Sequence, residues 1–385
     1  MTKNHTLPQR GPNEALIGKP GSRAQLTTPA LVLDLDRLEQ NIETMATHCR
    51  KAGHAIRPVA KIHKSVDIAR RQVAAGALGV CCATLREAEV MVEAGIPGVL
   101  LFSSVVTPAK IARLADLNTS ADGLMVALDD AANADALAAA ARAAGKPLKA
   151  LVDLDVGGKR TGLASVDAAC ALAKRITETE GLEYAGIQGY SGKTQRIADF
   201  ADRTAAQDDC IAPLRILADK LTAIGLAPGI VSGGGTGTQD IDPGQGLFTE
   251  SQAGTYVFMD VNYLRTPLWQ SEPSPYQTSL FVRASVISAA QPGFVITDAG
   301  MKEFAREEFP PEIATGAPAG ATYDLVGDDL GRINFANPRD TLAIGDAVEC
   351  ITPHCYATLN LYDVFHCVRG DTLVDIWPVA PRINW

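Results

Sequence analysis

The chain has 385 residues, and its 35 lysine and arginine residues against 44 aspartate and glutamate residues give a net charge of −9. This acidic balance, without a basic stretch, argues against nucleic acid as a partner. No apolar run approaches the ~20 residues that cross a bilayer, and the N-terminus lacks the apolar core of a secretory signal, so we expect no membrane partner. The eight cysteines have no spacing typical of a disulfide framework, which predicts reduced thiols in a cytoplasmic protein.

Residues 1–27 are rich in glycine, proline and polar side chains, which predicts a flexible or surface-draped lead-in. After it, apolar β-branched runs alternate with amphipathic stretches such as 36–53, 84–95 and 129–145. The runs predict strands at 31–35, 55–60, 79–83, 98–104, 123–128, 148–156, 182–190, 229–233 and 255–260. This alternation predicts an α/β fold with an eight-stranded TIM-type barrel over 28–270, so one run, the first or the last, belongs elsewhere. A doubly wound open sheet is the alternative, although no GxGxxG follows the first strand.

The pattern of apolar and turn-forming residues changes after about residue 270. Short apolar runs are separated there by glycine, proline and aspartate turns, with little helical periodicity. This pattern predicts an all-β C-terminal domain over 271–385. We expect the boundary within 264–277, where three prolines interrupt any regular element.

Polar residues gather where predicted barrel strands end, which is where the chemistry of such barrels collects. Lys61 and His63 follow the strand at 55–60, Arg160 follows 148–156, and Tyr190 ends 182–190. If the first of these strands continued, Lys61 and His63 would share one face. A lysine on the inner rim loses water, so its pKa should fall and its neutral amine could form a Schiff base with an aldehyde. The alternative is an ordinary solvated lysine in a turn.

The stretch SGGGTG at 232–237 is the strongest local signal. Its four glycines leave backbone N–H groups uncovered, and its two hydroxyls add donors, which suits a phosphate dianion. The alternative is a turn that needs positive φ angles. A phosphate loop, a lysine and an arginine at strand ends together predict pyridoxal 5′-phosphate as cofactor. Lys61 would bond to it, the loop Ser232, Gly233, Gly234, Gly235, Thr236 and Gly237 would hold its phosphate, and Arg160 would face the pyridine nitrogen.

Seven segments carry a family resemblance: RPVAKIHKS, GVCCATLREAE, DVGGKRTG, GIQGYSGKTQ, SGGGTGT, ESQAGTYVFMD and ITPHCYATLNLYD. In this order the chain resembles the D-threonine aldolase family, which includes 3-hydroxy-D-aspartate aldolases and D-serine dehydratases. The resemblance implies an alanine-racemase-like fold, with the strand at 31–35 joining the β domain, and a homodimer. It also implies Lys61 as the Schiff-base lysine, Arg160 as the pyridine-side arginine, and Tyr190 and Tyr256 beside the cofactor.

The departures from the family pattern lie around its metal and substrate. Where members have a His-x-Asp or His-x-Cys pair for a divalent metal (Mg, Mn or Zn), this chain has His354, Cys355 and Tyr356. Gln195 is followed by Arg196 instead of histidine, and the Glu-His-Gly turn appears as 329–331, Asp-Leu-Gly. With one histidine left, a hard cation would bind weakly, so loss of the metal is expected.

These residues keep alternative roles open. His354 is either a metal ligand or a hydrogen-bonded strand-end histidine, and His63 is either a donor beside Lys61 or a packed rim residue. Tyr356 is either packing or a base opposite Lys61, and Cys355 could be a zinc thiolate. Arg196, next to Gln195, could bind a substrate carboxylate through its forked donors or be a solvated helix-start residue.

The leading hypothesis is an enzyme that uses pyridoxal phosphate to cleave the Cα–Cβ bond of a D-3-hydroxy amino acid, giving glycine and an aldehyde. A racemase or epimerase is the second, with Lys61 on one face of Cα and Tyr356 or Cys355 on the other, because it needs no metal. Dehydration is the third. A cofactor carrier without activity is the non-enzymatic alternative.

Overall fold

The computed structural model describes residues 10–270 and 273–382. The start of the predicted lead-in, two residues of the predicted domain boundary and the last three residues of the predicted β domain therefore lie outside the described residues. The chain is divided into two compact units. Unit 1 contains the residues up to Ile42, Thr255–Arg265 and the residues from Pro275 to Arg382, and unit 2 contains Glu43–Gly254 and Thr266–Ser274.

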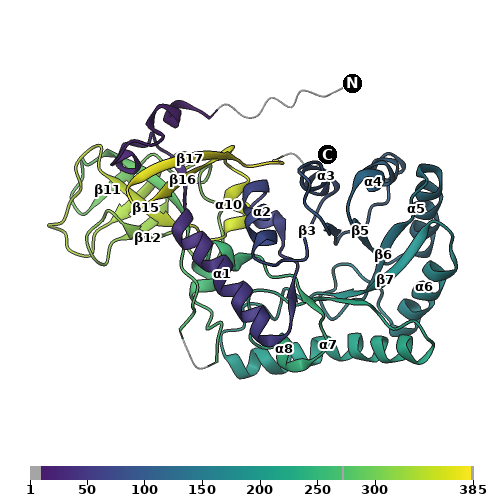
Figure 1. The fold of residues 1–385 in the computed structure, drawn as a ribbon. Helices are drawn as coiled ribbons and strands as arrows, with labels where there is room; N and C mark the ends of the chain where they lie inside the picture. Colours follow the sequence, from purple (N-terminus) through teal and green to yellow (C-terminus); the bar gives the residue numbers. More distant parts are fainter. Residues whose placement is uncertain (1–9, 271–272, 383–385) are drawn as a thin grey trace. The chain divides into compact units, whose positions relative to one another are not determined.

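Unit 2 is built on a parallel sheet of eight strands (Figure 1). The strands are β2 (Ala55–Ile56), β3 (Cys81–Cys82), β4 (Leu100–Leu101), β5 (Met125–Leu128), β6 (Leu148–Asp153), β7 (Leu182–Gly189), β8 (Ile230–Gly233) and β9 (Glu250–Ser251). Their order is β2-β9-β8-β7-β6-β5-β4-β3. A bridge between Val59 and Cys81 joins the two edges of this order, and the sheet closes into the expected barrel.

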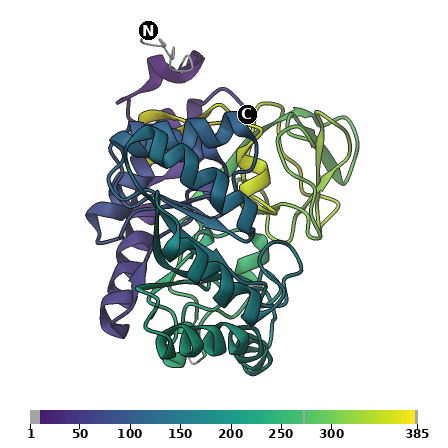
Figure 2. The same cartoon turned by 90° about the vertical axis from the view of Figure 1, so that its right-hand side faces the viewer.

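Helices cover the outside of this sheet, as Figure 2 shows for α3 to α6. They are α2 (Val66–Ala74), α3 (Leu85–Glu93), α4 (Pro108–Ser120), α5 (Ala131–Ala144), α6 (Val166–Glu178), α7 (Phe200–Ala223) and the short α8 (Asp242–Gln245), while the division between the units falls inside α1 (Leu35–Ala52). Helix α5 begins and ends where its sequence predicts. The Asp130 side chain accepts the Asn133 N–H at 2.8 Å, and Gly145 closes the helix with a left-handed φ of 78°.

Unit 2 has two apolar clusters, because successive side chains of a strand point to opposite faces of the sheet. Cys82 belongs to the large cluster between sheet and helices, whereas the neighbouring Cys81 packs with Leu100, Met125 and Leu151 in a smaller one. Adjacent residues of a strand point to opposite faces, so Cys81 lies on the other face of the sheet from Cys82. All eight cysteines are free thiols.

Unit 1 is an antiparallel sheet with one parallel pairing. Its strands are β1 (Ala30–Asp34), β10 (Leu280–Ser288), β11 (Phe294–Thr297), β12 (Glu312–Thr315), β13 (Thr322–Leu325), β14 (Gly331–Asn334), β15 (Ala347–Ile351), β16 (Val364–Arg369) and β17 (Thr372–Pro378). The main order is β13-β14-β11-β10-β1-β16-β17, and β15 pairs with β10 and β12. Strand β1 runs antiparallel to β10 and parallel to β16, so the first strand of the chain is part of this sheet.

Short helices complete unit 1. They are the 3₁₀ helices η1 (Pro12–Leu16), η2 (Ser22–Gln25) and η4 (Thr255–Val257), with α9 (Val261–Leu264) and α10 (Cys355–Leu359). Residues of the predicted lead-in are ordered here: Asn13 is buried, and its Nδ2 lies 2.9 Å from His366 Nε2. Among the described residues, no helix has both the length and the apolar composition to cross a bilayer.

Two strand predictions were wrong. Residues 255–260 contain η4 and a turn, and the eighth barrel strand is β9, which has only two residues, Glu250 and Ser251. A strand this short and polar has no apolar alternation to reveal it. The strand at 55–60 stops at Ile56, and the 3₁₀ helix η3 (Ala60–Ile62) follows, so the expected shared face of Lys61 and His63 does not exist.

Candidate active site

Four predicted features follow the carboxyl ends of barrel strands in unit 2. Lys61 lies on η3 after β2, the glycine loop 232–237 begins at the end of β8, Tyr190 follows β7, and Arg160 follows β6. The sheet order β2-β9-β8-β7-β6 therefore brings lysine, glycine loop, tyrosine and arginine to one rim. This is the end of a parallel barrel at which binding sites form.

Lys61 is largely buried, beside an aromatic ring and near the Arg160 cation. Its Nζ lies 5.4 Å from the centre of the Phe102 ring. Burial, and then the nearby Arg160 cation, lower the pKa of Lys61, against a smaller opposing effect of Glu87. An amine whose charged form is disfavoured is a better nucleophile near neutral pH.

The neighbouring basic residues have other surroundings. Lys64 is buried, and its Nζ pairs with Glu87 Oε1 at 3.6 Å. His63 is fully buried, its Nδ1 accepts the Ser65 N–H at 3.0 Å, and burial lowers its pKa to about 3. A neutral, packed imidazole at the end of η3 stabilises the turn that carries Lys61, and the catalytic role of His63 stays a prediction.

Arg160 and Tyr190 form a pair at the rim. The guanidinium carbon of Arg160 lies 5.2 Å from the centre of the Tyr190 ring. Burial raises the pKa of Tyr190, while the Arg160 and Arg196 cations act against that rise. Arg196 is exposed, and it stays a candidate for binding a substrate carboxylate.

Three carboxylates that the sequence analysis did not single out hold the Arg160 loop. Asp153 accepts the Thr161 hydroxyl at 2.9 Å, Asp129 accepts the Gly162 N–H at 2.8 Å, and Asp155 accepts the Lys159 N–H at 2.9 Å. Burial raises the pKa of Asp153 to about 6. Alternating acids at the end of a strand, Asp153 and Asp155 in LVDLDV, are the signal that could have identified them.

The glycine loop packs closely on polar side chains. Gly234 has a left-handed φ of +65°, and a Cβ at this position would collide with the Asp242 carboxylate. A Cβ at Gly235 or Gly237 would collide with Gln195. These glycines are needed for the backbone conformation and for the close approach to Asp242 and Gln195, whether or not a phosphate binds. The turn and the phosphate loop are therefore compatible interpretations of the stretch.

Several polar groups of the loop already have protein partners. The Gly235 N–H donates to Thr238 Oγ1 at 3.1 Å, and the Gly237 N–H donates to Gln195 Oε1 at 2.9 Å. Ser232 Oγ donates to Glu250 Oε1 at 2.8 Å. Gln195, predicted at the substrate, thus lies against the loop in this structure.

The other predicted site residues are in unit 1. The His354 and Tyr356 rings stack with centres 5.0 Å apart, and the Thr255 hydroxyl donates to the Tyr356 oxygen at 3.4 Å. Tyr256 is buried, and its ring centre lies 5.9 Å from that of Tyr276.

Asp260 is a buried carboxylate beside this cluster that the sequence analysis missed. Its Oδ2 accepts the Cys355 thiol at 3.2 Å and lies 3.8 Å from His354 Nδ1. Burial and Asp260 raise the pKa of the Cys355 thiol well above its usual value. Cys355 is therefore a buried thiol at the first position of α10.

A divalent cation lacks a donor set here. Within residues 10–270 and 273–382, no three His, Cys, Asp or Glu side chains are grouped to hold an ion. The carboxylate of Asp363, nine residues after His354, pairs with Arg382.

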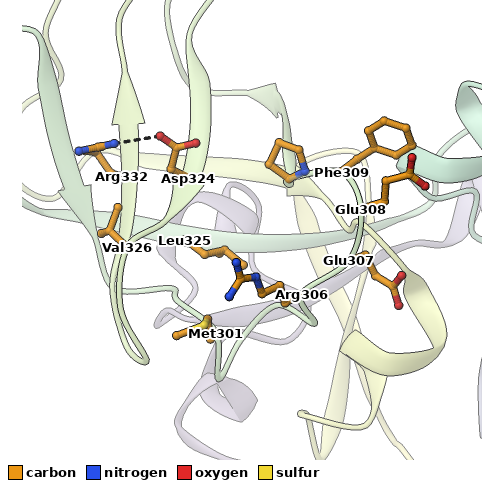
Figure 3. Close-up of a pocket in the computed structure, with 10 residues that line it drawn as sticks. Met301, Arg306, Glu307, Glu308, Phe309, Asp324, Leu325, Val326 and Arg332 are labelled. Atoms are coloured by element: carbon orange, nitrogen blue, oxygen red, sulfur yellow. Dashed lines mark hydrogen bonds and ion pairs between the residues drawn. The ribbon is translucent and has the colours of Figure 1, made fainter.

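Unit 1 has a hollow of about 560 Å³, and none of the predicted site residues is among those that line it. Figure 3 shows the lining side chains. Arg332 and Asp324 pair across one wall at 3.1 Å. Its lining is Met301, Arg306, Glu307, Glu308, Phe309, Pro310, Asp324, Leu325, Val326 and Arg332. Because acids and bases mix on its walls, the hollow has no single charge that would select a ligand.

Comparisons with known proteins identify both parts of the chain. Residues 33–261 match the family described as alanine racemase, N-terminal domain, and residues 279–368 match the putative serine dehydratase domain. The chain is 34% identical to 3-hydroxy-D-aspartate aldolase of Paracoccus denitrificans (strain Pd 1222) and 36% identical to D-threonine aldolase of an Arthrobacter species, with 93% of each chain covered in both cases. The crystal structure of D-threonine aldolase from Filomicrobium marinum superimposes with a TM-score of 0.90 at 35% identity, covering 93% of this chain and 96% of that one.

Proposed function

Because the chain belongs to the family of D-threonine aldolases and 3-hydroxy-D-aspartate aldolases, we propose that it is a pyridoxal-phosphate-dependent lyase. Its substrate would be a small D-3-hydroxy amino acid, cleaved between Cα and Cβ to glycine and an aldehyde. The observation that carries the proposal is the amine of Lys61, whose pKa is lowered by burial and by Arg160 on the rim that also bears the glycine loop.

The residues of unit 2 fit pyridoxal phosphate. Lys61 would bond to its aldehyde, the loop 232–237 would receive its phosphate, and Arg160 with Tyr190 would contact its ring. When bound, the cofactor supplies a sink for the electron pair of the broken bond. As the aldehyde forms, the β-hydroxyl of the substrate loses its proton, and Lys61 would deliver a proton to Cα in place of the bond to Cβ. Arg160 would keep a positive charge on the ring side and so restrain how far the ring itself is protonated.

The residues of unit 1 do not fit a divalent metal. The Cys355 thiol is buried and donates to Asp260. A tyrosine that stacks on His354 stands at the second position of the family's ligand pair, so His354 is the one histidine that remains of that pair. One imidazole holds a hard cation weakly. We therefore propose a cleavage that needs no bound metal, and we expect it to continue in EDTA.

The first test is spectroscopic. The purified chain with pyridoxal phosphate should show the visible absorbance of a lysine-bound cofactor, and Lys61→Ala should abolish it. Lys149→Ala is the matched control, since Lys149 is a partly exposed barrel lysine on β6. Equal absorbance in the Lys61→Ala variant would refute the assignment of Lys61.

Product analysis separates the reactions. D-threonine, D-phenylserine and 3-hydroxy-D-aspartate are assayed with EDTA and with Mn²⁺. Aldehyde with glycine supports the aldolase, whereas a keto acid with ammonia would identify a dehydratase, which the domain match at residues 279–368 makes the second candidate. Deuterium entering Cα without either product would identify a racemase.

We also propose that the enzyme is a cytoplasmic homodimer, on the family resemblance and on the eight free thiols. Sedimentation equilibrium of the purified chain would show a monomer if the dimer is wrong.

A further inference from the structure

Behind the glycine loop of unit 2 lies a buried polar network with no role in the proposed chemistry. It consists of Thr238, Asp242, Gln195, Gln207 and Thr194, each at most 3% exposed. Polar side chains buried this deeply are costly unless every hydrogen-bonding atom has a partner. The network therefore needs a reason to be kept.

The Thr238 hydroxyl is the centre of the network. Its oxygen accepts the Gly235 N–H at 3.1 Å and the Gln195 amide N–H at 3.2 Å, and it donates to Asp242 Oδ2 at 2.7 Å. A hydroxyl has one proton to donate and two lone pairs to accept with. The proton and both lone pairs are used, so this hydroxyl holds the Gly235 backbone, the Gln195 amide and the Asp242 carboxylate in place.

Asp242 anchors the hydroxyl to the body of the unit. Its Oδ1 accepts the Gln207 amide N–H at 2.8 Å, and Gln207 lies on helix α7. Thr194 in turn donates to Gln207 Oε1 at 2.9 Å. Burial raises the pKa of Asp242 to about 7, which reflects how far this carboxyl is removed from water.

The loop rests directly on these atoms. The Gly237 N–H donates to Gln195 Oε1, and a Cβ at Gly234 would collide with Asp242. The three glycines 234, 235 and 237 therefore let the backbone reach the network.

We propose that Thr238 is a positioning residue that, anchored by Asp242, presets the glycine loop for the phosphate of the cofactor. The inference rests on the proposed function, because it needs the loop to be the phosphate site. A preset loop loses less conformational freedom on binding, so its effect is on affinity. Without the hydroxyl, Gly235, Gln195 and Asp242 each lose a partner, and the loop can leave the binding conformation.

The test compares two substitutions at one position. Thr238→Val keeps the shape of the side chain and removes the hydroxyl, whereas Thr238→Ser keeps the hydroxyl. The full-length chain freed of cofactor is titrated with pyridoxal phosphate, and the visible absorbance gives Kd. We expect Thr238→Val to raise Kd by at least ~10-fold, because unpaired buried polar groups are costly, and Thr238→Ser to stay within ~3-fold.

Controls separate positioning from general damage. Asp240→Asn alters a neighbouring, less buried carboxylate and should leave Kd unchanged. With saturating cofactor, kcat of Thr238→Val should stay within ~3-fold of the wild type, since the loop is then held by its ligand. Inorganic phosphate should compete with the cofactor in the wild type and less well in Thr238→Val.

The outcomes are distinct. If Thr238→Val and Thr238→Ser bind equally well, or if Thr238→Val loses thermal stability with unchanged Kd, the positioning role is wrong and the proposed function stands. If the wild type gives no visible absorbance with pyridoxal phosphate, the positioning role of Thr238 and the proposed function are both wrong. Should Thr238→Val fail to fold, Asp242→Asn takes its place, with the same expected rise in Kd.

Discussion

The pair Arg57 and Glu250 gives the sharpest prediction about the barrel itself. Arg57 follows β2 and Glu250 opens β9, so the pair links two neighbouring strands, of which β2 is the edge strand next to the closing bridge. The guanidinium donates to both carboxylate oxygens, at 2.9 and 2.8 Å, and the side chains are 5% and 1% exposed. The remaining Arg57 donors reach the carbonyls of Leu78 and Gly98.

Glu250→Gln removes the charge that balances a buried guanidinium and places an amide NH₂ against one of its donors. Breaking a buried ion pair on one side costs ~3–5 kcal/mol, whereas replacing both partners by apolar residues is often neutral. We therefore expect Glu250→Gln to lower the free energy of barrel opening by ~3–5 kcal/mol. The double substitution Arg57→Met with Glu250→Leu should recover more than half of that loss.

The assay is hydrogen exchange at the backbone amides of β2, β8 and β9, because a chain of two units need not unfold in one step. Lys149→Ala, which breaks a partly exposed pair with Glu183 in the same barrel, is the control and should change little. The reasoning is refuted if Glu250→Gln lowers the opening free energy no more than this control does.

Three further predictions concern single side chains. Because burial and then the Arg160 cation lower the pKa of Lys61, Arg160→Gln should raise that pKa and move the pH profile of cofactor capture to higher pH; an unmoved profile would show that the cation has no influence. Tyr356→Asp should create a histidine–carboxylate pair with His354, so that isothermal titration detects Mn²⁺ binding in this variant; equal binding by the wild type would contradict our reading of the donors. Asp130→Ala should cost about 1 kcal/mol of stability by removing the N-cap of α5, and an unchanged thermal midpoint would contradict this.

The sequence was most informative where local pattern and chemistry coincide. Strand and helix alternation predicts the barrel because each βα unit must bury an apolar face. Lys61 and the loop 232–237 became candidate site residues because they come soon after apolar runs that the pattern predicts as strands. Helix α5 could be delimited because the capping aspartate and the closing glycine act within a few residues.

What the sequence did not reveal depends on contacts between distant residues. Strand β9 exists because β2 and β8 flank it, and its own two polar residues carry no β signal. Asp260 contacts the cluster at 354–356 although 95 residues separate it from Cys355 in the sequence. Asp242 follows the loop by a few residues, but nothing local tells a buried anchor from a solvated turn acid.

The glycine loop shows how the two kinds of information combine. Its composition suggests free backbone N–H groups that could bind an anion, yet two of its N–H groups donate to Thr238 and Gln195. Its glycines serve first to bring the backbone onto buried side chains, which fixes one loop conformation among many. Affinity for a phosphate then depends on how firmly that conformation is held, and less on how many amides are free. A loop with the same glycines but without Thr238 and Asp242 should therefore bind the same anion more weakly.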